Sequence, residues 1–185
     1  MAAAWRYADA LKALLGGGVI AYPTEAVWGL GCDPDNAAAV QHLLAIKKRP
    51  ADKGLILVAS QAEQLGCLLD ALDTSAIARL QAPTDVPTTW LLPHGDAVSP
   101  WITGRHATVA VRISSHPVIG GLCNAFGGML VSTSANPASR APARSQLRAR
   151  RYFSGAVDCY VPGPLGSAHR PSQIRDLITG HLLRA

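Results

Sequence analysis

Short apolar runs alternate with amphipathic segments along the whole chain, and the two patterns predict strands and helices respectively. Runs such as 55–59 and 108–113 have the length of a buried strand and contain several β-branched residues. We expect strands at 19–22, 55–59, 88–92, 108–113, 129–132, 157–161, 173–177 and 181–183. We expect helices at 1–15, 36–48, 117–126 and 146–152, with Asn36 capping the second and Ser145 capping the last. Two further helices are expected to start at Ser60 and at Thr74 or Ser75.

Helices and strands are mixed from one end of the chain to the other, which favours an α/β fold with a twisted mixed sheet. The 185 residues suit one domain with a full core, so we predict a single domain over 1–185 with its core at about 5–184. The segment 24–34 contains glycine and proline and is predicted to be a loop. The pattern does not indicate the order of the strands.

Composition excludes several classes of protein. Hydrophobic residues make up 49% of the chain and charged residues 16%, which is typical of a globular protein rather than a disordered one. No apolar run approaches the roughly 20 residues that cross a bilayer, and charges interrupt the first helix. We therefore expect no membrane span and no signal peptide, and predict a cytoplasmic protein. The four cysteines form no C-x-x-C pair, so neither a zinc site nor a disulfide framework is predicted.

Positive charge is concentrated in the second half of the chain. The net charge is +5, with −2 in residues 1–92 and +7 in residues 93–185. This asymmetry favours an anionic partner, either nucleotide phosphates or nucleic acid, although no P-loop motif is present. Five arginines lie within twelve residues and either contact nucleic-acid phosphates or form a solvated basic helix. They are Arg140, Arg144, Arg148, Arg150 and Arg151.

Lys47 and Arg49 form a candidate anion clamp. On a helix the two side chains would diverge by about 200°, but Arg49 precedes Pro50, and a residue before proline is pushed out of the helical region. Arg49 can then turn to the side of Lys47, and a point charge beside a bidentate fork suits a polyphosphate. Lys53 can add a third charge. The alternative is a solvated helix end whose cations favour the helix dipole.

Hydroxyl and amide side chains follow the predicted strand 129–132. While the chain stays extended, Ser132, Ser134 and Asn136 face the same way. There they can hold phosphate oxygens or the polar atoms of an amino acid without adding charge. The alternative is a polar turn that leads into Pro137.

Three further segments place polar groups at the ends of predicted strands. Thr24 and Glu25 open a glycine-containing loop, a common place for a site, and a tight turn around a packed tryptophan is the alternative. Arg112 ends an otherwise apolar strand, so its charge needs either a structural carboxylate or a substrate carboxylate. Ser172 begins a late strand, where its hydroxyl can lie at the edge of a cleft.

Together these segments resemble the YrdC-like family, and most closely its short, single-domain threonylcarbamoyl-AMP synthases. The K-x-R motif of the family is similar to Lys47-Lys48-Arg49, and its S-x-N motif is similar to Ser134-Ala135-Asn136. The start Tyr22-Pro23-Thr24-Glu25 and the end Pro171-Ser172-Gln173-Ile174-Arg175-Asp176 match in order and spacing. The resemblance implies a twisted mixed sheet, flanked by helices, around a large basic cleft.

The resemblance also implies a reaction. L-threonine, bicarbonate and ATP give threonylcarbamoyl-adenylate and pyrophosphate, and the adenylate is the precursor for threonylcarbamoyladenosine in tRNA. The implied class is a nucleotidyltransferase that uses Mg²⁺ held mainly by phosphates and waters, with separate proteins transferring the group to tRNA. In-line attack of a carbamate oxygen on the α-phosphate needs positioning and charge neutralisation more than a strong base.

Site residues follow from the resemblance by motif. ATP contacts are implied at Lys47, Arg49, Lys53, Thr108, Ser134, Asn136, Pro142 and Arg184, of which Lys47 and Arg49 would be catalytic. Threonine contacts are implied at Thr24, Arg112 and Ser172, with Arg112 on the carboxylate, and at Ser132 through its backbone. No dedicated metal ligands are implied.

One loop departs from the family pattern. Where the family commonly has W-P-G-P-x-T, this chain has Thr84-Asp85-Val86-Pro87-Thr88-Thr89. The loss of glycine requires a rebuilt loop, and Asp85 would be unfavourable near a polyphosphate. An RNA-binding module and a non-catalytic family member therefore remain alternatives. A carbamoyltransferase that contains a YrdC-like domain would be much larger and would carry zinc-binding segments that this sequence lacks.

Overall fold

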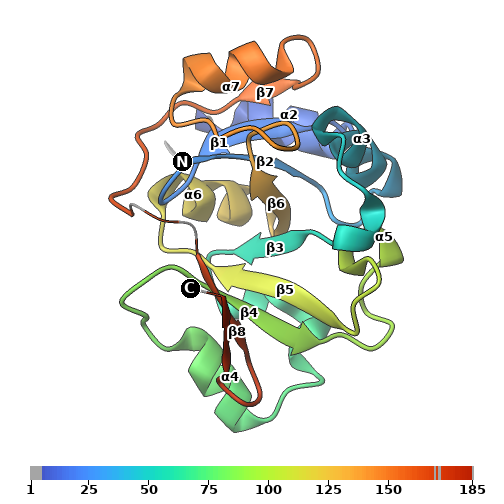
Figure 1. The fold of residues 1–185 in the computed structure, drawn as a ribbon, viewed down its shortest axis with the longest axis vertical. Helices are drawn as coiled ribbons and strands as arrows, with labels where there is room; N and C mark the ends of the chain where they lie inside the picture. Colours follow the sequence, from blue (N-terminus) through green and yellow to red (C-terminus); the bar gives the residue numbers. More distant parts are fainter. Residues whose placement is uncertain (1–5, 169, 171, 185) are drawn as a thin grey trace.

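A nine-stranded sheet with helices on both faces runs through the computed structural model, which describes residues 6–168, 170 and 172–184 (Figure 1). The helices are α2 (Ala8–Leu15), α3 (Ala37–Lys47), α4 (Thr74–Gln81), α5 (Pro100–Thr103), α6 (Pro117–Phe126) and α7 (Gln146–Phe153), with 3-10 segments η1 (Ala51–Lys53) and η2 (Ala62–Leu69). The strands are β1 (Ile20–Pro23), β2 (Trp28–Cys32), β3 (Ile56–Ala59), β4 (Thr88–Pro93), β5 (Thr108–Ile113), β6 (Leu130–Ser134), β7 (Cys159–Tyr160), β8 (Gln173–Asp176) and β9 (Leu182–Arg184). The predicted α/β fold with a mixed sheet is confirmed.

Strands that are far apart in the sequence are neighbours in the sheet. The order is β7-β1-β2-β6-β3-β5-β4-β8-β9. β1 pairs with β7, β3 with β5 and β4 with β8 in parallel, and the other described pairs are antiparallel. This order brings β2, β6, β3 and β5 together in the middle of the sheet, so the polar segments at their ends become neighbours.

The sheet is covered on both faces by separate apolar clusters. Along β1, Ile20 and Tyr22 pack in a cluster with α2 and α6, whereas Ala21 packs in a second cluster with α3 and η2. Successive side chains of a strand point to opposite faces, so a strand covered on both sides has no polar positions. This explains why strands such as β1 and β3 appear in the sequence as continuous apolar runs.

The predicted loop at 24–34 is wrong in its second half, because Trp28–Cys32 forms β2 and is buried throughout. The segment was predicted to be a loop because its two glycines, Gly29 and Gly31, are typical of turns. Gly31 is required by close packing, since a Cβ there would lie 2.5 Å from the carbonyl oxygen of Val131 and 2.9 Å from the ring of Tyr22. A glycine within a strand often marks such a close approach of another backbone.

Most of the other predicted elements are confirmed, with ends that differ by a few residues. Asn36 and Ser145 cap α3 and α7 as predicted, each accepting a hydrogen bond from a backbone N–H of the first turn. The helix predicted at 1–15 is described from Ala8, and residues 1–5 lie outside the described part of the chain. No described helix is both long and apolar enough to cross a membrane.

Two predicted helix starts are wrong. The segment η2 begins after Gln61 rather than Ser60. The cap of α4 is Asp73 rather than Thr74 or Ser75, because its carboxylate accepts a hydrogen bond from a first-turn backbone N–H at 2.7 Å. The single turn α5 was not predicted, since four residues are too few to display a helical period.

Candidate functional site

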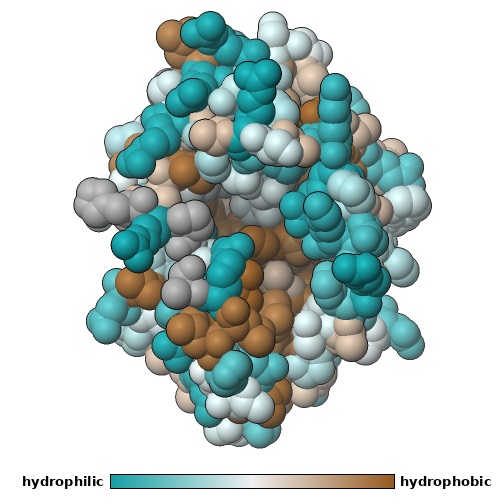
Figure 2. All heavy atoms as spheres, in the orientation of Figure 1, coloured by the Kyte–Doolittle hydropathy of each residue, from teal (hydrophilic) through white to brown (hydrophobic). Residues whose placement is uncertain are grey.

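A cleft of about 300 Å³ gathers the ends of segments that lie far apart in the sequence. Its walls come from the loop between β1 and β2, the chain after α3, the strands β3, β5 and β6, and the C-terminal strands. The face seen in Figure 2 is hollowed near its centre, where Figure 1 places β3 and β6. Eight predicted site residues line the cleft: Thr24, Arg49, Arg112, Ser132, Ser134, Pro142, Ser172 and Arg184.

Four predicted site residues do not line the cleft: Lys47, Lys53, Thr108 and Asn136. Lys47 and Asn136 lie directly behind Ser134, and each forms a hydrogen bond with it. Lys53 is exposed on η1, and its backbone carbonyl accepts a hydrogen bond from Arg49 at 3.2 Å. Thr108 begins β5 opposite Pro93 of β4, at the end of the strand away from Arg112.

Lys47, Ser134 and Asn136 form what we call the Lys47 corner. The buried ammonium of Lys47 donates to the backbone carbonyl of Ser134 and, at 2.9 Å, to that of Asn136. The Ser134 hydroxyl donates to Asn136 Oδ1 at 2.6 Å. Burial, and then the nearby Arg49, lowers the pKa of Lys47 to about 8. The partners of the ammonium are neutral carbonyls, so this corner keeps a full positive charge while Lys47 is protonated.

Arg49 reaches the cleft wall separately from Lys47. Its Nε and Nη2 atoms donate to the carbonyl of Gly54 at 3.1 and 2.8 Å, which fixes the guanidinium against the chain after η1. Burial lowers the pKa of Arg49, with Asp52 acting in the opposite direction. The two cations of the predicted clamp therefore have different partners, and only Arg49 lines the cleft directly.

Glu25, Arg112 and Ser114 form what we call the Arg112 corner. Arg112 donates to one carboxylate oxygen of Glu25 in an ion pair whose two side chains are each 15% exposed. The hydroxyl of Ser114 donates to the other oxygen at 2.6 Å. Of the two partners that the sequence left open for Arg112, the structural carboxylate is thus present. Burial lowers the pKa of Arg112 to about 10, so the guanidinium remains charged at neutral pH.

Each of the three serine and threonine residues predicted to contact threonine has its hydroxyl oriented by a hydrogen bond. Tyr22 donates to Ser132 Oγ at 2.9 Å, and burial raises the pKa of Tyr22, which keeps it a donor. Thr24 Oγ1 donates to a backbone carbonyl within its own turn at 2.8 Å. The hydroxyl of Ser172 lies 2.8 Å from that of the fully buried Thr89. The side chains on this wall are therefore held in fixed directions before any ligand binds.

The altered residues of the loop 84–89 lie beside the cleft, although Pro87 of the same loop lines the cleft itself. Thr84, Asp85 and Val86 are exposed and line a neighbouring hollow of about 690 Å³, which shares Glu25, Pro87 and Arg170 with the cleft. Asp85 does not line the cleft itself. The predicted conflict between Asp85 and a polyphosphate would therefore arise in the neighbouring hollow and not at the cleft wall.

Sequence reasoning missed several residues of the site. Glu25 and Arg170 line the cleft, and Ser114 and Thr89 hold lining residues from behind. Glu25 directly follows Thr24 in a motif that was recognised, and this position was the one available signal. Among the described residues, no group of three or more His, Cys, Asp or Glu side chains could hold a metal ion.

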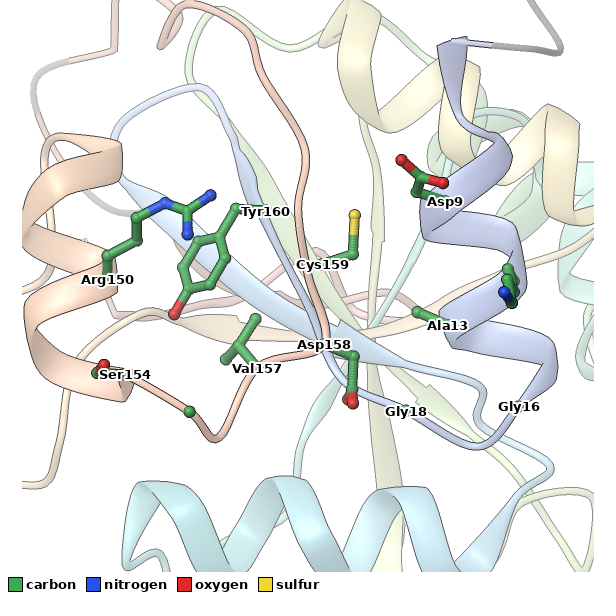
Figure 3. Close-up of a pocket in the computed structure, with 12 residues that line it drawn as sticks. Asp9, Ala13, Gly16, Gly18, Arg150, Ser154, Val157, Asp158, Cys159 and Tyr160 are labelled. Carbon is green, nitrogen blue, oxygen red and sulfur yellow. The ribbon is translucent and has the colours of Figure 1, made fainter.

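A larger hollow of about 800 Å³ lies between α2, α7 and β7 (Figure 3). Arg150 stacks over the ring of Tyr160, 4.2 Å from its centroid, and Asp158 accepts a hydrogen bond from the backbone N–H of Val19 at 2.8 Å. These polar groups are already engaged within the protein. None of the residues predicted to contact ATP or threonine, all of which are described, lines this hollow, although Arg150 of the predicted RNA-contacting arginines does. The smaller cleft is therefore the candidate site.

Known proteins resemble this chain over nearly its whole length. A family model for Sua5, YciO and YrdC proteins, described as "Telomere recombination", matches residues 12–185. The chain is 54% identical over 175 residues to a threonylcarbamoyl-AMP synthase of Saccharophagus degradans, covering 95% of this chain and 92% of that protein. It is 50% identical over 184 residues to one of Pseudomonas entomophila, covering 100% of this chain and 99% of that protein.

Solved structures agree with this assignment. P. abyssi Sua5 complexed with L-threonine matches with a TM-score of 0.84 and 30% identity. The match covers 94% of this chain and 51% of that one, so the chain spans about half the length of that Sua5 protein. E. coli YciO has the same fold, with a TM-score of 0.79 and 24% identity over 98% of this chain and 89% of that chain. The chain belongs to the Sua5/YciO/YrdC family.

Proposed function

We propose that this protein is a threonylcarbamoyl-AMP synthase, a nucleotidyltransferase that uses L-threonine, bicarbonate and ATP and releases pyrophosphate. The observation that carries the proposal is that one cleft is lined by residues of all five motif segments on which the family resemblance rests. It is supported by relatives of that name with 54% and 50% identity over nearly the whole chain.

ATP binds along the side of the cleft that adjoins the Lys47 corner. Arg49, Ser134 and Arg184 line this region, and the positive charge of Lys47 lies directly behind Ser134. The ammonium of Lys47 has neutral hydrogen-bond partners among the described residues, so its charge remains available to attract a polyphosphate. Mg²⁺ would arrive as part of the ATP substrate, held mainly by phosphate oxygens and water.

Threonine binds on the other side, at the Arg112 corner. The guanidinium of Arg112 suits the substrate carboxylate, and Thr24, Ser132 and Ser172 supply oriented hydroxyls for the remaining polar atoms. P. abyssi Sua5 has been solved in complex with L-threonine, which supports threonine as a ligand of this protein.

The reaction needs the two substrates to meet in line. The amine of threonine and bicarbonate form a carbamate and water, and a carbamate oxygen then attacks the α-phosphorus while pyrophosphate leaves. The transition state carries more charge on its phosphate oxygens, which Arg49 and the Lys47 corner can stabilise. The fixed hydroxyls of the other wall hold the nucleophile in position.

We also propose that the protein acts in the cytoplasm and that separate proteins transfer the threonylcarbamoyl group from its product to tRNA. The arginines predicted to contact tRNA are all exposed, at Arg140, Arg144, Arg148, Arg150 and Arg151. In Figure 2 hydrophilic side chains gather over the part of the molecule where Figure 1 places α7. If this segment binds RNA phosphates, the affinity falls steeply with salt, whereas threonine-dependent turnover does not follow the same slope.

The experiment that tests the function is pyrophosphate release from MgATP and bicarbonate, with and without L-threonine, beside an L-serine control. We expect release that depends on threonine and exceeds that with serine. Folded protein that binds ATP but releases no pyrophosphate with threonine would contradict the proposal and favour a non-catalytic or RNA-binding role.

A further inference from the structure

The Arg112 corner contains a carboxylate to which the proposed reaction assigns no part. We propose that Glu25 is a positioning residue that sets the affinity for threonine, by holding Arg112 at the cleft wall and balancing its charge. The inference rests on the proposed function, since it assumes that Arg112 receives the carboxylate of the amino acid.

The backbone of Glu25 is fixed by the chain segment that crosses it. Gly166 N–H donates to the carbonyl of Thr24 at 3.0 Å, and Ala168 N–H donates to the carbonyl of Glu25 at 3.0 Å. A Cβ on Gly166 would lie only 2.8 Å from the Cα of Glu25, so the two backbones are in direct contact. The base of the Glu25 side chain therefore has little freedom to move.

The carboxylate end of Glu25 is fixed as well. Ser114 holds one oxygen and Arg112 holds the other, so rotation of the carboxylate would break both bonds. Both partners lie on or just beyond β5, which pairs with β3 and β4 in the middle of the sheet. Glu25 thus ties the loop between β1 and β2 to a rigid strand, and Arg112 is held from the side.

Arg112 keeps hydrogen-bonding capacity after Glu25 is satisfied. A guanidinium has five N–H donors, and Arg112 uses Nη2 for Glu25 while its buried Nε has no partner among the described residues. A second carboxylate can bind along another edge of the same guanidinium. Nε is itself enclosed by the protein, so the donors left for a ligand in the cleft are those of the terminal guanidinium nitrogens.

The ion pair also changes which ligands the corner prefers. Arg112 and Glu25 are neutral together, which suits a zwitterionic amino acid whose net charge is zero. An Arg112 without its carboxylate would be a free buried cation and would attract phosphate, including the phosphates of ATP. Glu25 therefore keeps phosphate out of the threonine position as well as holding Arg112 in place.

The test measures binding of L-threonine and of ATP by titration calorimetry to the full-length protein and to Glu25→Gln. Gln has nearly the shape of Glu without its charge, so we expect threonine affinity to fall about tenfold or more, with ATP affinity within about twofold of wild type. Inorganic phosphate should compete with threonine in Glu25→Gln and not in the wild type. Glu63→Gln is the matched control, because Glu63 is exposed on η2 and its described side-chain hydrogen bond is a long one, 3.4 Å from Gln81.

Ser114→Ala is a milder variant that keeps both charges and removes the bond of 2.6 Å to Glu25. It should weaken threonine binding about threefold, which tests the proposal if Glu25→Gln does not fold. Threonine affinity within twofold of wild type in either folded variant would overturn the role of Glu25. An equal loss of threonine and ATP affinity without phosphate competition would also overturn it. A wild-type protein that binds no threonine would instead contradict the proposed function itself.

Discussion

The two corners of the cleft treat a buried cation in opposite ways. In the Lys47 corner the ammonium donates to two neutral backbone carbonyls, of Ser134 and Asn136. In the Arg112 corner the guanidinium is paired with the carboxylate of Glu25. The first arrangement leaves a net positive charge inside the protein, whereas the second is neutral.

In the proposed reaction, this difference in net charge would direct the two substrates to different corners. A polyphosphate is drawn to the corner that has a net positive charge, and a zwitterionic amino acid suits the corner where charge is balanced. The position of each corner follows from the strand order, because Ser134 ends β6 while Arg112 lies near the end of β5, with β3 between these strands. A variant that removes one of the two cations should therefore weaken the binding of one substrate and leave the binding of the other unchanged.

Arg112→Gln should have the largest effect. It removes the guanidinium proposed to bind threonine and leaves Glu25 as an unpaired, largely buried carboxylate, which typically costs about 3–5 kcal/mol. We expect the KM for threonine in pyrophosphate release to rise about a hundredfold or more, with a much smaller change in the KM for ATP. Arg105→Gln is the control, since this arginine is 76% exposed and its pair with Asp52 spans 3.8 Å. Unchanged threonine kinetics in folded Arg112→Gln would remove Arg112 from the site.

Lys47→Met should have the next largest effect and should act on ATP. Met has a similar length and no charge, so Ser134 and Asn136 lose a shared donor and the corner loses its positive charge. We expect the KM for ATP to rise about ten- to a hundredfold, while threonine binding measured without ATP stays near wild type. Lys48→Met is a matched control because Lys48 is exposed. An equal rise in the KM for ATP in both variants would show that the effect comes from the loss of any positive charge near α3 and not from Lys47 in particular.

Alkaline pH should reproduce part of the Lys47 effect. Burial lowers the pKa of Lys47 from 10.5 to about 8, so above that pH the ammonium loses its proton and kcat/KM for ATP should fall. Stability should move the other way: the unfolded chain binds the extra proton between about pH 8 and 10.5, which favours the folded state as pH rises.

The difference between wild type and Lys47→Met isolates this contribution. The buried thiols of Cys32 and Cys123 have their pKa raised from 9.0 to about 12, so they lower stability at high pH in both proteins. We expect the pH dependence of ATP kinetics above pH 8 to be present in the wild type and absent in the variant. Identical pH profiles would contradict the assignment to Lys47.

Thr89→Val should have the smallest effect. It keeps the shape of a fully buried side chain and removes the partner of Ser172, which lies 2.8 Å away. An unsatisfied buried hydroxyl costs about 1–3 kcal/mol, so the melting temperature should fall by several degrees and the KM for threonine should rise about fivefold. Thr89→Ser keeps the hydroxyl and should restore the KM. If Thr89→Val has the same KM for threonine as the wild type, the hydrogen bond from Thr89 is not needed to orient Ser172.

The sequence predicted most elements of the fold because its local signals were strong. Asn36 and Ser145 are caps that act within one turn, and runs such as 108–113 are apolar enough to identify a buried strand. β2 was missed because its glycines resemble those of a turn. Gly31 is explained only by close contacts with Val131 on β6 and Tyr22 on β1, the two strands that flank β2 in the sheet. The strand order depends on such contacts and has no local signal.

The site was predicted unevenly for a similar reason. The motif residues Thr24, Arg49, Ser134 and Ser172 were found, and the cleft brings them together. The direction of Lys47 was not predictable, because its partners lie 87 and 89 residues away along the chain. Glu25 was in a recognised motif, but its role depends on a bond to Arg112, which is also 87 residues away. Motifs identify which residues matter, and the tertiary contacts decide what each one does.

The most direct test of the division between the two corners is a paired titration of Arg112→Gln and Lys47→Met, each with L-threonine alone and with MgATP alone. We predict that Arg112→Gln loses threonine binding and keeps ATP binding, and that Lys47→Met shows the reverse. Loss of both ligands in both folded variants, or loss of ATP alone in Arg112→Gln, would contradict the account.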